Sequence, residues 1–284
     1  MNSMKFGGLS WIYHEEPHDT GKSLLAVYNP LRYNRSMPTP FTHLETAQRL
    51  LEDPTLPDDV RQTLNSERPA FLLGSIAADA RNSAGIRREQ THFYIYDFPS
   101  KTPAWREMLR RHPSMHPANN TPQRVFIAGY AAHLAVDEVW SEDMMRRQIS
   151  EREWAPWHRR FTMMHILLAY MDERDAARLH DWQPGTLLAA TPTHWTSFLP
   201  DNILSDWRDF VGSQLQPGGV SQTLNVFSDR IGLLPEDIRE ILDSPETMQR
   251  DLWQHITPAK LEEIEGKMYA FAREQLLRYW SESG

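Results

Sequence analysis

The chain contains no cysteine among its 284 residues. Disulfide bonds and thiolate metal sites are therefore excluded, and a metal ion would need histidine, carboxylate or backbone oxygen ligands. The sequence also lacks any stretch close to the roughly 20 consecutive apolar residues that a membrane-spanning helix needs. The first thirty residues show no basic-then-apolar signal segment. These absences predict a cytoplasmic protein without a transmembrane segment.

Long basic runs are absent as well. The net charge is −8, and the 30 basic and 38 acidic residues are interspersed along the chain. Proteins that bind the nucleic-acid backbone usually carry a basic patch, so stable nucleic-acid binding is not expected. The negative net charge does not exclude nucleotide substrates, because a bound metal ion can supply the local positive charge. The sequence carries no signal for an oligomeric state.

Strand signals are few. Residues 91–98, which read THFYIYDF, alternate weakly and predict either a short strand or a loop held by its aromatic rings. Residues 1–40 are rich in glycine and proline and show no sustained period, which predicts an irregular segment. Helical patterns account for much of the rest, and they cover residues 42–52, a short stretch after Pro57, and residues 102–112, 122–149, 155–180, 200–215, 219–232, 235–243 and 258–281.

The pattern therefore predicts an all-α fold. We expect an irregular segment at 1–40, a helical core at 41–183 that carries the functional site, and a C-terminal helical part at 184–284 within the same domain; Pro184–Gly185 marks the division. Two helix starts are predicted from capping signals. Thr42 is the expected N-cap of the first helix, with Glu45 three residues later. Thr102 is the expected cap of another helix, with Pro103 at its first position.

The clearest helix reads VFIAGYAAHLAVDEVW over residues 125–140. It is apolar on all faces from Val125 to Val136, which is typical of a buried helix. His133 and Asp137 lie four residues apart and so share one face. Burying an ionised carboxylate without a partner costs several kcal/mol. The two side chains must therefore pair with other groups or hold a metal ion.

Three more residues of the same chemistry occupy apolar or aromatic surroundings. Asp79 ends the apolar run AFLLGSIAADA, His92 lies in THFY, and His43 lies in PFTHLE. With His133 and Asp137 they form a set of three histidines and two aspartates without a thiol, which suits zinc, or else manganese or iron. One or two such ions would lower the pKa of a bound water toward about 7 and allow its attack on a phosphorus or carbonyl centre.

Four segments carry a resemblance to a known family. In chain order they supply His, Asp, His, and then His-x-x-x-Asp in an apolar helix. The four segments read PTPFTHLETA (38–47), FLLGSIAADA, THF and FIAGYAAHLAVDEVW. Over residues 38–145 the chain resembles the zinc-dependent phospholipase C family. The resemblance implies a single all-helical domain, related to the fungal single-strand-specific nucleases, here with additional C-terminal helices.

The resemblance also implies roles for the five residues. Asp79, His92, His133 and Asp137 would hold one zinc, and Asp137 would bridge to a second ion that His43 also holds. Asp79 could instead act as general base, which makes it the candidate catalytic residue. The implied activity is metal-dependent hydrolysis of a lipid or small-molecule phosphoester or phosphodiester.

One part of the family pattern is missing. The family's third metal uses a later His-x-x-x-Glu pair, whereas His158 and His165 are followed at four positions by Thr162 and Ala169. One or two ions are therefore expected rather than three.

Other functions have weaker signals. An HD-type phosphohydrolase would need a His-Asp doublet, and His18–Asp19 and His180–Asp181 are such doublets, but neither lies in an apolar helix. The segment DTGKS at 19–23 resembles the end of a phosphate-binding loop without its first glycine. A further alternative is a family scaffold that binds a small molecule, or performs non-hydrolytic chemistry, without a catalytic metal.

Overall fold

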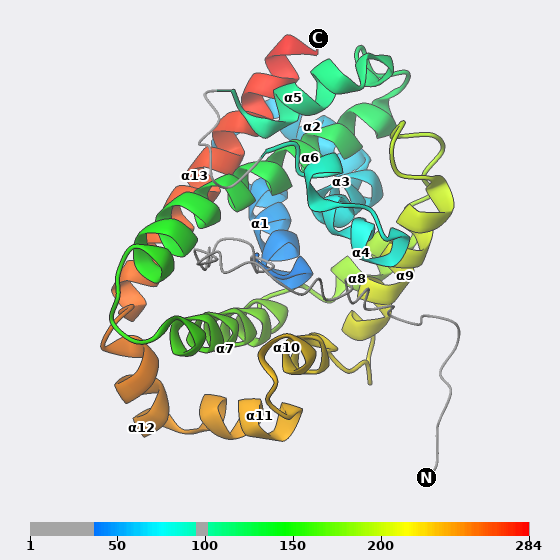
Figure 1. Ribbon diagram of the computed structural model, residues 1–284. Coiled ribbons are helices and arrows are strands. Elements are labelled where there is room, and N and C mark those ends of the chain that lie inside the picture. Colours follow the sequence, from blue (N-terminus) through cyan, green and yellow to red (C-terminus); the bar gives the residue numbers. More distant parts are fainter. Residues whose placement is uncertain (1–36, 95–101, 284) are drawn as a thin grey trace, which may run out of the picture. The chain divides into compact units, whose positions relative to one another are not determined.

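The structure is a computed structural model that describes residues 37–94 and 102–283. Within these ranges every regular element is helical, which confirms the predicted all-α fold (Figure 1). Residues 91–94 form no strand. Outside the described residues lie the rest of the aromatic segment 91–98, most of the predicted irregular segment, His18–Asp19 and residues 19–23. None of the described helices is both long enough and apolar enough to cross a lipid bilayer.

Thirteen labelled α-helices follow one another in the described ranges: α1 (Pro40–Glu52), α2 (Asp58–Ser66), α3 (Arg68–Ile76), α4 (Arg81–Ala84), α5 (Ala104–Arg111), α6 (Thr121–Val139), α7 (Trp157–Ala176), α8 (Trp182–Leu188), α9 (Asp201–Leu215), α10 (Thr223–Ile231), α11 (Pro235–Asp243), α12 (Pro245–Met248) and α13 (Pro258–Glu282). Short 3₁₀ turns separate some of them, at η2 (Ala77–Ala80), η3 (Arg88–Gln90) and η4 (Pro113–Met115). The wider π-helical form occurs in η5 (Trp140–Ser150) and η6 (Gln249–Trp253).

Helix α6 is the centre of the fold. Every residue from Val125 to Asp137 is buried, as its all-round apolar sequence predicts. Asn120 is the N-cap of this helix, and its side chain accepts a hydrogen bond from the backbone N–H of Gln123 at 2.9 Å. Helices α3 and α13 pack along it, and α1 and α5 contact it as well (Figure 1). Side chains on α6 therefore meet residues from distant parts of the sequence.

The contact between α3 and α6 is unusually close because each helix carries a glycine there. A Cβ atom added to Gly74 would lie 2.1 Å from the carbonyl oxygen of Phe126, and one added to Gly129 would lie 2.4 Å from the carbonyl oxygen of Phe71. Any side chain would push the two backbones apart. The glycines thus place the end of α3 directly against the face of α6 that carries His133.

Both predicted cap positions are wrong. Helix α1 begins at Pro40 with Thr39 in the cap position, because the proline ring sets a helical φ for the first position. Thr42 lies inside the helix and donates a hydrogen bond to Asp175 of α7 at 2.7 Å. Helix α5 begins at Ala104, and Pro103 occupies the cap position with an extended ψ of 140° instead of the first helical position.

The C-terminal half contains helices that the sequence patterns did not predict, namely α8, α12 and η6. Pro184 and Gly185 lie within α8, whose first turn tolerates a proline because its N–H needs no helical partner. The predicted helix at 122–149 is present, but it changes from α6 to the π-helical η5 at Trp140. The division of the domain at residue 184 stays a prediction.

Candidate metal centre

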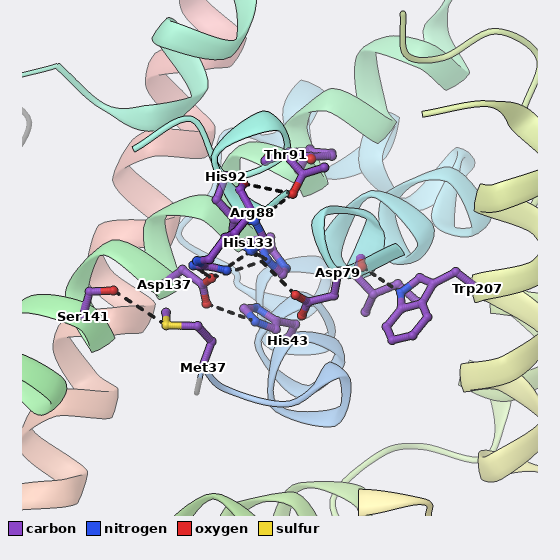
Figure 2. A network of polar contacts seen from close by, with 12 residues as sticks. Met37, His43, Asp79, Arg88, Thr91, His92, His133, Asp137, Ser141 and Trp207 are labelled. Carbon is purple, nitrogen blue, oxygen red and sulfur yellow. Dashed lines mark hydrogen bonds and ion pairs between the residues drawn. The ribbon is translucent and has the colours of Figure 1, made fainter. Parts of the chain in front are cut away.

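The five predicted site residues meet at one place in the structure (Figure 2). They come from α1 (His43), η2 (Asp79), the turn after η3 (His92) and one face of α6 (His133 and Asp137). Four of them are at most 1% exposed, and Asp79 is 9% exposed. The cluster is therefore nearly closed to solvent, and Asp79 is its most accessible member.

Two overlapping sets of three ligand atoms in this cluster lie close enough together to hold a metal ion, one from Asp79, His92 and His133 and one from His43, His133 and Asp137. The Nε2 atom of His92 lies 3.6 Å from Asp79 Oδ1, 3.2 Å from Asp137 Oδ2 and 3.4 Å from His133 Nε2. His133 Nε2 lies 3.7 Å from Asp137 Oδ2. Ligands at zinc distances of 2.0–2.1 Å in a tetrahedron are separated by about 3.3 Å. The contacts around His92 and His133 are close to this spacing, and each set of three fits zinc in ligand type.

His43 belongs to the set that includes Asp137. Its ring stacks on that of His133 with 3.8 Å between centroids, and its Nε2 lies 3.4 Å from Asp137 Oδ1. The two atoms do not have the geometry of a hydrogen bond, and in the described part of the chain neither ring nitrogen of His43 nor Asp137 Oδ1 has a hydrogen-bond partner. Buried polar atoms without partners are rare in folded proteins. A cation close to these atoms would satisfy them.

Hydrogen bonds orient the two central imidazoles. His133 Nδ1 donates to the carbonyl oxygen of Ser75 at 2.8 Å, which leaves Nε2 free to bind a metal. The hydroxyl of Thr91 donates to the carbonyl of Arg88 at 3.3 Å. His92 Nδ1 lies 2.9 Å from the same hydroxyl oxygen and therefore acts as the donor in that contact. The hydroxyl of Tyr130 on α6 donates to the Thr91 carbonyl at 2.7 Å and so fixes this turn.

Strained backbone follows His92 directly. Phe93 has a φ of 59°, in the left-handed region that a residue with a side chain seldom adopts. Its buried ring lies against the rings of His112 and Phe198 at centroid distances of 5.7 and 5.1 Å. This packing compensates a strain of about 1–3 kcal/mol. The turn thereby directs His92 into the cluster.

The protonation states also suit a metal. Burial lowers the pKa of His92 to about 3, and the nearby Arg88 charge adds to the effect; burial lowers the pKa of His133 to about 4. Burial alone would raise the pKa of the Asp137 carboxyl, but interactions with His133 and Arg88 hold it well below its usual range. The pKa of Asp79 is lowered too, because its interactions with His133 and His92 outweigh burial. Neutral imidazoles and ionised carboxylates are the forms that bind metal ions.

Arg88 is a member of the site that the sequence did not predict. Its Nη2 donates to Asp137 Oδ2 at 2.8 Å and to the hydroxyl of Tyr94 at 3.0 Å. The residue lies in the polar stretch RREQ, which is typical of an exposed loop, and its partner Asp137 is 49 residues away. No local pattern therefore signals this contact. The sequence analysis also did not identify Ser75 and Thr91 as residues that orient the imidazoles. The only signal for Thr91 is its position next to His92.

Other histidines lie apart from the cluster. His165 is fully buried, with its Nδ1 2.8 Å from the carbonyl of Phe161 and its ring between those of Phe161 and Phe227. His180 is half exposed and lies 3.2 Å from Glu52. Neither belongs to any described group of three or more residues that could hold a metal.

The state of His165 leads to a prediction about acid stability. Burial lowers its pKa to about 4, whereas in an unfolded chain the value is about 6.5. As the pH falls below about 6.5, the unfolded state binds the proton first, so this residue reduces the free energy of unfolding. Between about pH 7.5 and pH 5 the loss is about 2 kcal/mol.

Replacing His165 by phenylalanine removes this contribution. Urea unfolding at the two pH values should show a pH dependence smaller by about 2 kcal/mol in His165→Phe than in the wild type. An unchanged pH dependence would show that His165 is not held neutral by burial.

Comparisons with known proteins agree with this geometry. Residues 42–182, about half of the chain, match the family model described as zinc dependent phospholipase C. The matched range contains all five clustered residues. Comparisons with curated proteins and with solved structures give no match. The family match and the His/Asp cluster support a metal-dependent hydrolase with zinc as its metal, and the family suggests a lipid phosphoester substrate. The chain belongs to the zinc-dependent phospholipase C family.

Proposed function

We propose that this protein hydrolyses phosphodiesters or phosphoesters with a zinc ion held by Asp79, His92, His133 and Asp137. The observation that carries the proposal is the convergence of these side chains, with ligand-atom contacts of 3.2–3.7 Å and two overlapping sets of three residues that could hold a metal ion. The proposed substrate is a lipid phosphodiester, as the family that the chain matches suggests, or a small phosphoester. The cytoplasmic location predicted from the sequence stays a prediction.

Zinc bound at such a site would polarise the phosphoryl group and supply a water of lowered pKa. The chain itself supplies orientation and exclusion of solvent. Ser75 and Thr91 fix the rings of His133 and His92 through their Nδ1 atoms, so both Nε2 atoms face the centre. The buried rings around them exclude bulk water, which strengthens electrostatic interactions inside the site.

Asp79 is the candidate general base. It is the most exposed member of the cluster, so a substrate or water reaches its carboxylate more easily than the others. Its carboxylate is ionised at neutral pH and can accept a proton from a water at its free oxygen. Because Oδ1 faces His92 at 3.6 Å, the same carboxylate can contribute both a ligand and a base.

Removal of the metal tests the proposed function. Protein purified without added zinc should contain zinc by elemental analysis, and a chelator should abolish hydrolysis of a phosphodiester such as bis(p-nitrophenyl) phosphate. Added zinc should restore the activity, since the donor set suits zinc better than magnesium. Activity that persists in the metal-free protein would contradict the proposal.

Replacing Asp79 by asparagine separates its role from folding. The variant keeps the size of the side chain but loses the negative charge and the base, so we expect the turnover number to fall by about 10²–10⁴-fold. Asp172→Asn is a matched control, because Asp172 is a buried carboxylate on α7 that accepts hydrogen bonds from Thr223 and Ser221 outside the cluster. Equal activities of the two variants would count against Asp79 as the base.

A second candidate function has one observation in its favour. The guanidinium of Arg88 lies 2.8 Å from Asp137 Oδ2 and so neutralises one of the two carboxylates without any ion. A family scaffold that binds a small molecule without a catalytic metal would have such a contact. This alternative predicts purified protein without zinc and no effect of chelators on ligand binding.

A further inference from the structure

The ring of His43 is held differently from the other two imidazoles of the cluster. The rings of His133 and His92 are each oriented by a hydrogen bond at Nδ1. Neither ring nitrogen of His43 has a hydrogen-bond partner in the described part of the chain. Its ring stacks on that of His133 at 3.8 Å and faces Asp137 Oδ1 at 3.4 Å. Beyond these two contacts, its position depends on where helix α1 places its backbone.

The first turn of α1 carries His43 and has one long-range side-chain anchor. The backbone N–H of His43 donates to the carbonyl of Thr39 at 3.3 Å, and Thr39, in the cap position, makes no side-chain capping hydrogen bond. Uncapped helix ends open readily. The hydroxyl of Thr42, the residue before His43, donates to Asp175 Oδ2 on α7 at 2.7 Å. Both of these side chains are buried, so this hydrogen bond ties the first turn of α1 to α7 (Figure 1).

Asp175 is itself fixed by charged partners on its other oxygen. Arg174 Nε donates to Asp175 Oδ1 at 2.9 Å, and Arg178 Nη1 lies 3.7 Å from the same oxygen. The guanidinium of Arg174 also pairs with Glu265 of α13, with Nη1 3.1 Å from Oε2. Oδ1 therefore receives the arginines and Oδ2 receives Thr42. A hydrogen bond to a compensated, ionised carboxylate is stronger than one between neutral groups, so the link from α7 to α1 is a firm one.

We infer that Asp175 positions His43 in the metal centre, because its hydrogen bond with Thr42 holds the first turn of α1 in place. The inference rests on the proposed function in one respect, the binding of zinc by the cluster. Neither Asp175 nor Thr42 belongs to the two sets of possible metal ligands. The effect therefore passes through the backbone of α1, and Asp175 is a positioning residue and not a ligand.

The zinc affinity of the full chain, measured by competition with a chelating indicator, tests the inference without any activity measurement. Thr42→Val keeps the shape of the side chain but removes the hydroxyl donor. Outer hydrogen bonds contribute about 10–100-fold to metal affinity, so we expect the apparent Kd for zinc to rise by about 10-fold. Thr42→Ser keeps the hydroxyl and should bind zinc like the wild type.

Gln48→Met is the matched control for loss of contact between the same parts of the chain. Gln48 lies further along α1 and donates to the carbonyl of Arg178, just after α7, at 3.1 Å. It lies more than one helical turn from His43. Gln48→Met should therefore be less stable than the wild type and should keep its zinc affinity.

A double-mutant cycle separates positioning of His43 from a general loosening of the fold. His43→Ala alone should weaken zinc binding, and Thr42→Val should cause no further loss in that background, since the ring that it positions is absent. A further loss of the same size in the His43→Ala background would overturn the inference. So would wild-type affinity in a folded Thr42→Val protein.

These outcomes are distinct from failure of the proposed function. Either of them removes the role of Asp175 and leaves the zinc hydrolase intact, whereas no zinc in the wild type would overturn both. Circular dichroism checks that each variant is folded. Should Thr42→Val fail to fold, Thr42→Ala removes the same hydroxyl and takes its place in the cycle.

Discussion

Replacing His133 by alanine is expected to remove the bound zinc and to reduce phosphodiester hydrolysis by at least about a thousandfold. His133 Nε2 contacts two other donors of the cluster, at 3.4 Å from His92 Nε2 and 3.7 Å from Asp137 Oδ2. Without it, three donors would remain and the ring of His43 would lose its stacking partner. Zinc content and turnover number should therefore fall together.

The loss must be distinguished from unfolding, because His133 is buried in the central helix. We expect His133→Ala to remain folded but less stable, since deletion of a large buried side chain typically costs about 2–5 kcal/mol. His165→Ala is the matched control: it removes an equally buried histidine from α7 and should keep the zinc and the activity. A His133→Ala protein that stays folded and retains zinc would contradict the assignment of this residue.

Replacing Gly129 by alanine is expected to have the largest effect on stability. The added methyl group would meet the carbonyl oxygen of Phe71 at 2.4 Å and the backbone nitrogen of Ser75 at 3.0 Å. Backbone atoms cannot rotate away as a side chain can, so α3 and α6 must separate along their contact. We expect a loss of at least about 3 kcal/mol in the free energy of unfolding, measured by urea denaturation.

The same substitution at Gly266 provides the control. Gly266 is an exposed residue of α13, and an added Cβ there would meet nothing within 4 Å. Alanine is a better helix former than glycine, so Gly266→Ala should stabilise the protein by about 0.5–1 kcal/mol. If Gly129→Ala were tolerated as well as Gly266→Ala, the close contact between α3 and α6 would be refuted.

The Gly129 contact also links stability to the site. Ser75, which the new methyl group would displace, is the residue whose carbonyl accepts the hydrogen bond from His133. A shift of α3 would therefore disturb the orientation of that ring, and outer hydrogen bonds of this kind typically contribute about 10–100-fold to metal affinity. Any folded Gly129→Ala protein should bind zinc more weakly than the wild type.

The sequence predicted the helical class and the central helix well, for a physical reason. A helix that is apolar on every face has few places in a fold except the core, so the burial of residues 125–137 could be foreseen. The same apolar surroundings singled out His133 and Asp137, because polar side chains there need compensation. The convergence of His43, Asp79 and His92 on them followed from the family resemblance, since no periodicity encodes contacts between distant segments.

The remaining features depend on tertiary contacts. Thr42 carried a capping pattern, but Pro40 started the helix earlier and Thr42 became a partner of Asp175 on another helix. No local pattern around Arg88 indicates a role in the site, and only the fold brings it to Asp137. Local patterns report local preferences, whereas both of these contacts join residues more than forty positions apart.

Anomalous X-ray diffraction at the zinc absorption edge, from crystals of protein purified without added metal, tests most directly whether this cluster is a metal centre. The proposed site predicts one strong peak about 2.0–2.2 Å from donor atoms of Asp79, His92, His133 and Asp137. A map with no peak there, in which Arg88 and the histidines contact the two carboxylates and leave no space for an ion, would contradict it.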